Sequence, residues 1–200
     1  MITFSFLRQA MGSLLIAMTC IGCSSNSIDI FQSTEKYRAT QNYENYLTAK
    51  LKKDDVQYVK YGDTRTLIIP MDRYFIIDSN EFSDNNCKGL EDSLKLIKLY
   101  PKSHIFVAGF NDDIGSPSLQ RHLTQGRADR VLTYLWTHGI PAKRMSADGY
   151  GYLFPLGSNR QIHSSAYNRR IEIQWSKSPK SCCMEPKAES SNWLNVFSMK

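Results

Sequence analysis

Residues 104–117, HIFVAGFNDDIGSP, decide the fold of this chain. Residues 104–109 are rich in β-branched and aromatic side chains, which predicts a buried strand. Residues 111–117 combine Gly, Pro, Asn and Asp, which predicts a turn-rich loop. Apolar residues at helical spacing then predict a helix that ends at His138, because Gly139 supplies a stop signal. A strand, a loop and a helix in this order are typical of α/β packing.

The segments on either side continue this alternation of strands and helices. They are β-type runs at 67–69, 74–77, 145–149 and 170–175 and a helix at 83–100. In the last run, apolar Ile171, Ile173 and Trp175 alternate with Arg170, Glu172 and Gln174, so we expect each set on its own face of a sheet. The pattern predicts one α/β (α+β) domain over residues 64–175, with a mixed sheet of about four strands and helices packed on one face.

The composition excludes several classes of protein. The chain has 200 residues, of which 42% are hydrophobic and 22% charged, so it is neither wholly disordered nor a multispanning membrane protein. The net charge is +6, but Lys and Arg are scattered along the sequence rather than gathered in one patch. We therefore expect no nucleic-acid partner.

Residues 1–22 have the pattern of a secretory signal peptide. One cation, Arg8, precedes an uncharged run that is shorter than the roughly 20 apolar residues of a membrane-spanning helix. The end of the run resembles a bacterial lipobox, which implies cleavage before Cys23 and acylation of this residue. Cys20 stands where Leu is usual, so a plain secretory signal stays open. By analogy, Ser24 after the cysteine favours an anchor in the outer membrane, at its periplasmic face.

The segments that flank the predicted domain are polar. Residues 23–63 are rich in Tyr and contain helical spacing within 36–59, which leaves both a tether and a partner-binding arm open. Residues 176–200 have no period and predict a flexible tail, or a segment that orders on a partner.

If the chain is exported, its three further cysteine thiols lie in an oxidising compartment, where disulfides can form. Cys87 can form a disulfide with Cys182 or Cys183, or the thiols can stay free or pair with another chain. No Cys-x-x-Cys pair or His cluster predicts a metal site, and we expect no cofactor.

Four motifs follow one another in the order of a known domain. They are GFNDDIGS at 109–116, LTQGRA at 123–128, ADGYG at 147–151 and NRRIEI at 168–173. Together they resemble the OmpA C-terminal-like, peptidoglycan-associated domain over essentially all of residues 64–175. The resemblance implies an OmpA-like fold in a protein that holds peptidoglycan.

The resemblance also implies a binding site for a zwitterion. Diaminopimelate in the stem peptide of peptidoglycan ends in an ammonium and a carboxylate, which need one anion and one cation at a fixed separation. By resemblance, Asp112 receives the ammonium and Arg127 the carboxylate. Asp78 and Asn80 match positions that approach the ligand in relatives, and Arg169 would orient or extend the site.

The residues themselves leave other roles open. Asp112 can open an Asx turn, and Arg127 can form a surface ion pair, which stabilises by less than about 1 kcal/mol. If Thr124 caps the helix, Arg127 lies in the first turn, close to the loop. If the helix starts at Ser118, Arg127 lies about ten residues along it, roughly 15 Å down the axis, and the loop must fold back to reach it.

Four residues, at three places, depart from the family's pattern. They are Asn111 for Thr, Leu119-Gln120 for Tyr-Asn, and Thr124 for Ser. The change at 119–120 is expected to remove polar support beside the loop, which would weaken or abolish ligand binding and leave a structural module.

Within the family, the sequence resembles the lipoproteins of the Dot/Icm type IVB secretion apparatus. The resemblance rests on LIIPMDRYF at 67–75, VAGF at 107–110, TYLW at 133–136 and residues 168–175. All of them follow the cysteine that is expected to be lipidated. The resemblance implies a lipoprotein that binds peptidoglycan and anchors a secretion complex, with other core proteins as partners. A scaffold with a silent glycan site is the alternative. Because the sequence has no Ser-His-Asp arrangement, Gly-x-Ser-x-Gly, His-Glu-x-x-His or phosphate loop, we do not expect an enzyme.

Overall fold

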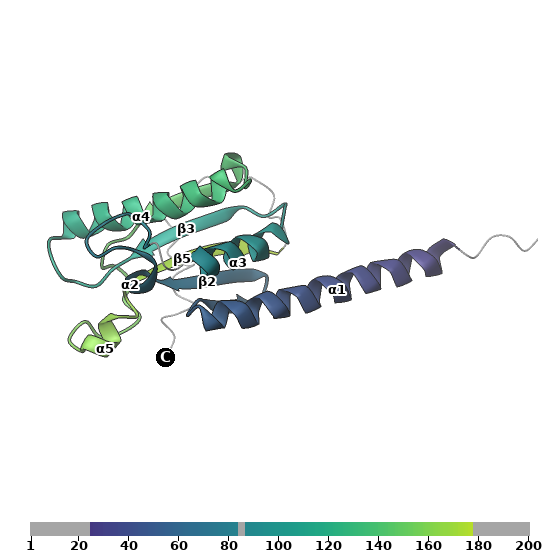
Figure 1. Ribbon diagram of the computed structural model, residues 1–200, viewed down its shortest axis with the longest axis horizontal. Helices are drawn as coiled ribbons and strands as arrows, with labels where there is room; N and C mark the ends of the chain where they lie inside the picture. The colour runs from purple at the N-terminus through teal and green to yellow at the C-terminus, as the bar shows by residue number, and fades with distance from the viewer. Residues whose placement is uncertain (1–24, 84–86, 178–200) are drawn as a thin grey trace, which may run out of the picture. The chain divides into compact units, whose positions relative to one another are not determined.

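The computed structural model describes residues 25–83 and 87–177, and two compact units divide the chain at Tyr43 and Glu44 (Figure 1). Helix α1, Ser25–Lys53, begins in the first unit and ends in the second, which confirms a helix in the Tyr-rich segment. The signal segment, Cys23 and nearly all of the predicted tail lie outside the described residues. The side chains of the three other thiols do too. No helix in the described ranges is both long and apolar enough to cross a membrane.

The second unit is built on a mixed sheet with the strand order β1-β2-β5-β3-β4. Its strands are β1 Gln57–Tyr61, β2 Thr64–Pro70, β3 Ile105–Phe110, β4 Met145–Gly149 and β5 Arg170–Ser176. Only β3 and β4 are parallel. The described residues thus form five strands rather than about four, because β1 comes from the segment expected to be an arm. It pairs with β2 through a tight hairpin in which Gly62 has a φ of 54°.

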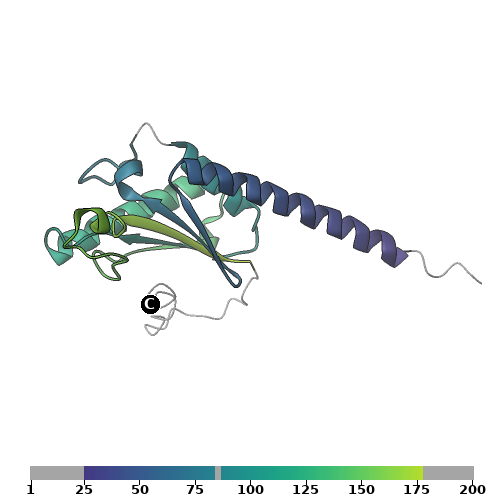
Figure 2. The ribbon, with the colours of Figure 1, turned by 90° about the horizontal axis from the view of Figure 1, so that it is seen from below.

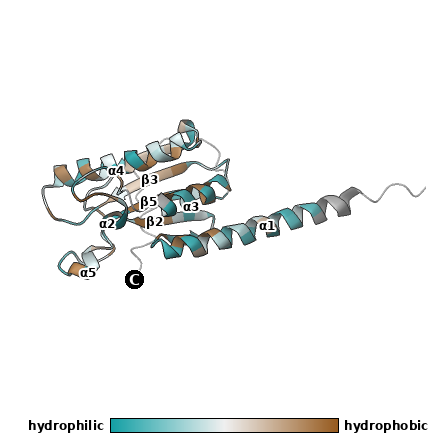
Figure 3. Ribbon diagram, viewed as in Figure 1, coloured by the Kyte–Doolittle hydropathy of each residue, from teal (hydrophilic) through white to brown (hydrophobic). Residues whose placement is uncertain are grey.

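Helices cover one face of the sheet, as the sequence predicts (Figures 1 and 2). They are α3 Cys87–Lys98, α4 Pro117–Thr137 and residues 44–53 of α1, while α2 Met71–Tyr74, α5 Ile162–Ser165 and η1 Ala142–Arg144 are short. The apolar side chains of these helices join those of the central strands in one core (Figure 3). Within it Leu67 and Val107 lie opposite Ile173 in register, and fully burying such a side chain stabilises by about 1.5–3 kcal/mol.

The alternation predicted for β5 is confirmed. Ile171, Ile173 and Trp175 belong to the core, whereas Arg170 and Glu172 form a buried ion pair on the other face, with Nε and Oε1 2.7 Å apart. The ion-pair partner of Arg170 lies on its own strand, and its cross-strand contact is the ring of Phe110, 4.0 Å from the guanidinium carbon.

The β-type run at 74–77 is not a strand. Pro70 ends β2 and begins α2, so that Tyr74 is the last residue of a short helix. The short helix and the extended residue that follows it bury both Tyr74 and Phe75 in the core. Phe75 forms only an isolated bridge with Phe82, and the loop between them becomes part of the candidate site.

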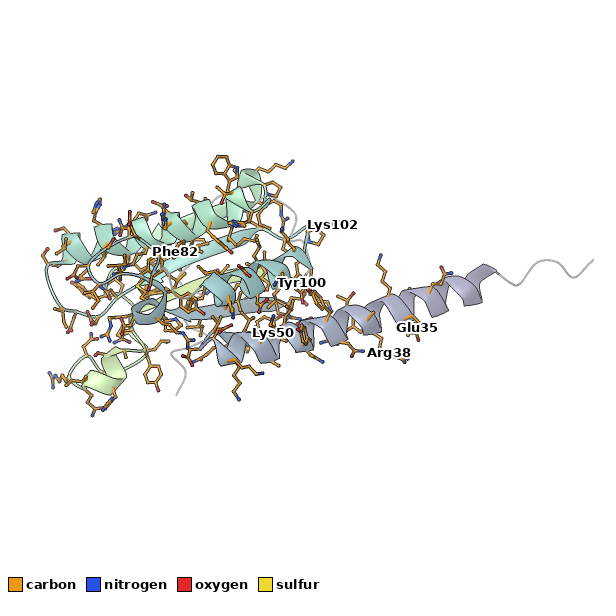
Figure 4. All side chains as sticks on the ribbon, in the orientation of Figure 1. Glu35, Arg38, Lys50, Phe82, Tyr100 and Lys102 are labelled. Atoms are coloured by element: carbon orange, nitrogen blue, oxygen red, sulfur yellow. The ribbon has the colours of Figure 1, made fainter. Side chains whose placement is uncertain are left out.

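The carboxyl end of α1 is fastened to the sheet through Glu44. This buried carboxylate accepts hydrogen bonds from Tyr58 (2.7 Å) and Tyr100 (3.0 Å) and pairs with Lys60 (2.6 Å). Burial alone would raise the pKa of Glu44, but the bonds from Lys60, Tyr58 and Tyr100 outweigh it and hold this pKa below its ordinary value. Farther along the helix, Lys50 pairs with a buried carboxylate of α3 (Figure 4). Residues 44–53 therefore belong to the domain.

Glu44→Gln should lower the free energy of unfolding by about 1–3 kcal/mol at pH 7, because it removes the anionic partner of the Lys60 ammonium and of the half-buried Tyr58 and Tyr100 hydroxyl groups. Because the pKa of Glu44 is lower in the folded chain, its negative charge stabilises the fold at any pH above the ordinary pKa of Glu. This contribution is lost as the pH falls through the lowered pKa of Glu44. Urea unfolding at pH 7 and at about pH 3 measures both effects, and the two proteins should converge at the acid pH.

Glu35→Gln is the matched control, since Glu35 lies on the same helix in an exposed pair with Arg38 (Figure 4). It should leave the unfolding midpoint unchanged. Equal midpoints for Glu44→Gln and Glu35→Gln would show that Glu44 does not hold the helix to the sheet.

Candidate functional site

Two of the predicted site residues, Asp112 and Arg169, meet Asp72 at one end of the sheet. Asp72 lies in α2 directly after β2, Asp112 follows β3, and Arg169 precedes β5. The ends of β2 and β3 lie opposite the first residue of β5 in register. The three side chains therefore start from adjacent positions of the sheet, although two of them are far apart in sequence.

Arg169 bridges two carboxylates. Its Nε and Nη2 donate to Asp72 over 2.8 Å and 2.5 Å, and its Nη1 donates to Asp112 Oδ2 over 2.7 Å. Hydrogen bonds to Asp72 raise the pKa of Arg169 above its ordinary value and those to Asp112 add to this, while burial acts against them. The planar fork of Arg suits this bidentate contact. That Arg169 orients a ligand-binding site stays a prediction.

The carboxylates outnumber the cation in this cluster. Asp72 and Asp112 share Arg169, so the three side chains carry a net charge of −1 (1 − 2). Asp112 is only 4% exposed, and among the described residues its Oδ1 accepts one long contact, 3.4 Å from the Ile114 N–H. The Asx turn considered for Asp112 is thus present in weak form. The cluster keeps an acceptor oxygen and an unbalanced negative charge.

Arg127 lies far along its helix. Ser116 caps α4 by accepting from Leu119 N–H, and Pro117 occupies the first turn, so Arg127 is the eleventh residue of the helix. A start at Thr124 is wrong, because the Ser-Pro pair supplies an earlier cap. Thr124 instead lies inside the helix, where its hydroxyl accepts from Gly151 N–H over 2.9 Å.

The loop that reaches Arg127 is the one after α2, not the one after β3. The guanidinium donates to the carbonyl oxygens of Ser79 (2.9 Å) and Ile76 (3.3 Å) and to Met71 Sδ (3.1 Å), and it lies over the ring of Phe75. All of these partners are neutral. Arg127 is 5% exposed, so a surface ion pair is not its role.

This environment leaves Arg127 as an uncompensated buried cation. Burial lowers the pKa of Arg127, and the charges of Asp72 and Asp78 offset part of that effect. Neither carboxylate contacts the guanidinium within the described residues. The position therefore has a net charge of +1 and a positive potential that a carboxylate could balance.

Asp78 and Asn80 lie together beside Arg127. Both line a surface pocket of about 440 Å³, with the other lining residues Ser79, Glu81, Leu119, His122 and Leu123. Asn80 packs so close to α4 that a side chain at Gly126 would meet its amide at 2.2 Å. The Oδ1 atom of Asn80 is buried and has no hydrogen-bond partner in the described parts of the chain. At the end of this loop, the ring of Phe82 (Figure 4) contacts the ring of Tyr134 on α4.

Helix α2 connects the two halves of the site. Met71 contacts Arg127, and the next residue, Asp72, binds Arg169, which in turn binds Asp112. Ser79 contacts Arg127 and lines the pocket. The structure thus links Arg127, Arg169 and Asp112 through α2 and places Asp78 and Asn80 in the adjoining pocket, but it records no direct bond between Asp112 and Arg127.

Sequence analysis missed two residues of this network. Asp72 received no role, and only its place directly after a strand could have indicated one. Gln120 was expected to weaken the loop after β3, but its side chain donates to the Ile114 carbonyl and accepts from the Asn111 amide. The polar support is therefore present in a different form, and only Leu119 is an apolar replacement, with an exposed side chain.

Nothing in the described ranges adds a metal centre to this network. No group of three or more His, Cys, Asp or Glu side chains there is arranged to hold an ion. The chemistry of the site is that of fixed charges and hydrogen-bond acceptors.

The fold and the site define an α/β domain with buried, separated charges at one end of its sheet. Residues 74–169 match the OmpA family, and this part of the chain is an OmpA-like domain. The cell wall anchor of the T6SS from Pseudomonas aeruginosa has the same fold, with a TM-score of 0.60 and 24% identity over 66% of this chain and 94% of that one. At this identity the likeness concerns the fold alone.

Curated relatives include lipoproteins. The probable lipoprotein YiaD of Escherichia coli is 32% identical over 127 residues, or 64% of this chain and 58% of YiaD. The peptidoglycan-associated lipoprotein of Buchnera aphidicola is 25% identical over 167 residues, or 80% of this chain and 91% of that protein. The chain spans only 32% of the length of outer membrane porin F from Pseudomonas fluorescens.

Arg169→Lys should lower the free energy of unfolding by about 1–3 kcal/mol, because a single ammonium cannot hold Asp72 and Asp112 with the geometry of the guanidinium fork. Urea unfolding measures this loss. The control is Arg160→Lys, at an exposed arginine of the segment before β5. If both variants unfold at the wild-type urea concentration, the bridge does not stabilise the domain.

Proposed function

We propose that this domain binds peptidoglycan without cleaving it, by holding the zwitterionic end of diaminopimelate. The observation that carries this proposal is the pair of unbalanced charges on either side of α2. The cluster of Asp72, Asp112 and Arg169 carries −1, and Arg127, bonded to neutral groups alone in the described residues, carries +1. A ligand with an ammonium and a carboxylate at one end matches this arrangement in sign and order.

Each end of the ligand has a partner in the proposal. The ammonium binds Asp112, whose Oδ1 has acceptor capacity left, and the charge of Asp72 supports it. The carboxylate binds the Arg127 guanidinium, where charge-assisted bonds replace weaker bonds to the carbonyl groups of Ile76 and Ser79. This exchange requires the exposed loop at 76–79 to move.

The pocket beside Arg127 supplies room for the rest of the diaminopimelate residue. Ser79 lines the pocket, and its carbonyl oxygen accepts from Arg127, so this residue stands between the pocket and the guanidinium. Asn80 offers the unpaired acceptor oxygen, which suits an amide or ammonium N–H, and Asp78 adds negative charge. The similarity to the peptidoglycan-associated lipoprotein of Buchnera aphidicola, whose name states the same ligand, supports the proposal.

The wider setting in the proposal is the outer membrane. The lipobox-like sequence before Cys23 supports a lipid anchor that holds the chain at the periplasmic face, and lipoproteins occur among the relatives. The finer assignment is to the IcmN/DotK lipoproteins of the Dot/Icm secretion apparatus. It rests on the sequence features at 67–75, 107–110, 133–136 and 168–175 and makes other core proteins of that apparatus the partners.

Binding of a diaminopimelate-containing muropeptide, measured by isothermal titration calorimetry on the full chain in detergent, tests the site. Asp112→Asn and Arg127→Lys should each weaken binding by about tenfold or more, because each alters a desolvated charge contact. Asp113→Asn and Arg121→Gln are matched controls, since both side chains are exposed nearby, and they should bind like the wild type.

The competing function is a scaffold whose glycan site is silent, and Leu119 in place of a polar residue is the observation that favours it. Retention on purified sacculi separates the two. Retention that Asp112→Asn and Arg127→Lys leave intact, together with no heat of muropeptide binding, would establish the scaffold and refute the clamp.

Cys23→Ser should move the protein from the membrane fraction to the soluble periplasmic fraction, because two or more acyl chains give stable anchoring and their loss leaves none. Mass spectrometry of the mature amino terminus provides the direct readout. An unchanged membrane fraction with no acyl mass on the wild-type protein contradicts the anchor but leaves the binding site untouched.

A further inference from the structure

The segment between β4 and β5 exposes an unusual amount of apolar surface. Within residues 150–167, which we call the β4–β5 segment, Ile162 is 86% exposed and Tyr167 63% exposed. Leu153, Phe154 and Leu156 are exposed as well. Apolar side chains gathered on one short segment are typical of a binding surface, whereas single exposed ones are ordinary.

The β4–β5 segment is held in one conformation by a buried amide. Asn168 Oδ1 accepts from the N–H groups of Leu156 (2.7 Å) and Gly157 (2.9 Å), and its Nδ2 donates to the Gly157 carbonyl and to Asn159. The two arms of the segment touch, because a side chain at Gly157 would lie 2.3 Å from Ser164 Oγ. The apolar side chains are thus presented by a fixed backbone, which lowers the entropy lost on binding.

The charges of the β4–β5 segment have one sign. No Asp or Glu occurs between residues 149 and 171, whereas Arg160 and His163 are exposed within the segment. In the described ranges neither of these side chains forms an ion pair. The surface is therefore complementary to a partner that is both anionic and partly apolar.

The β4–β5 segment adjoins the proposed site. Ser165 Oγ lies 3.5 Å from Arg169 Nη1, the group that also binds Asp112. In Figure 1, α5 and α2 lie at the same end of the sheet. A ligand held at Asp112 would therefore lie beside one end of this segment.

We propose that the β4–β5 segment is a second contact surface for peptidoglycan, which binds the stem peptide beyond the free end of diaminopimelate. This inference rests on the proposed function and adds to it. The stem peptide carries carboxylates, which suit Arg160 and His163, and alanine methyl groups, which suit Ile162 and Leu156. The segment thereby selects the polymer over the free amino acid.

Two ligands and two pairs of variants test the inference by calorimetry on the full chain. The ligands are free meso-diaminopimelic acid and a disaccharide-peptide muropeptide that contains it. Ile162→Ser combined with Arg160→Gln should weaken muropeptide binding by about fivefold or more and change binding of the free amino acid by less than about twofold. Higher salt should reduce this difference, because Arg160 acts through its charge.

The matched control combines Trp136→Ser with Lys143→Gln. Trp136 is 57% exposed near the end of α4, and Lys143 lies in η1, so both precede β4 while the β4–β5 segment follows it. The control pair should bind both ligands like the wild type. Circular dichroism with a thermal melt verifies that each variant is folded.

The outcomes separate this inference from the function on which it rests. If the wild type binds neither ligand, the clamp fails and this inference with it. If both ligands bind and the variants at 160 and 162 bind the muropeptide like the wild type, only the second contact surface is overturned. A change of oligomeric state in those variants, seen by sedimentation, would instead assign the surface to a second copy of the chain and also overturn the inference.

Discussion

The site depends on one arginine that two carboxylates share. Arg169 precedes β5 and joins Asp72, after β2, to Asp112, after β3. Because three strand ends meet at this guanidinium, its geometry fixes α2 against the loop after β3 and leaves the cluster one negative charge in excess. A simple ion pair would have no net charge and would not attract a cationic ligand. This excess negative charge is the reason for proposing that a cationic group binds at this end of the sheet.

The second constraint is that Arg127 is buried without a carboxylate in contact with it among the described residues. Its position on α4 is set by the early cap at Ser116, and its partners are carbonyl oxygens of the loop at 76–79 and the sulfur of Met71. Burying a charge in this way costs free energy that a neutral side chain would not. A bound carboxylate would recover part of that cost, which gives the separation of charges across α2 a functional reason.

Those parts of the fold that depend on local sequence patterns could be predicted from the sequence. The strands at 145–149 and 170–175 and the alternation within the latter follow from periodicity, and the order of the motifs gives the OmpA-like fold. The bridge from Asp72 to Arg169 could not be predicted, since 97 residues separate the two and no local pattern links them. The strand predicted at 74–77 is wrong, because Tyr74 is the last residue of a short helix, and both Tyr74 and Phe75 are buried. Gln120 shows that support for a loop can come from a different side chain than the family's pattern predicts.

The central claim is that two opposite charges across α2 bind one zwitterion. A crystal structure of the protein with a diaminopimelate-containing muropeptide tests it most directly. The account predicts the ligand ammonium within hydrogen-bond distance of the Asp112 carboxylate and the ligand carboxylate on the Arg127 guanidinium, with the loop at 76–79 displaced from its present contacts. A ligand bound elsewhere, with Arg127 still bonded to the carbonyl groups of Ile76 and Ser79, would contradict it.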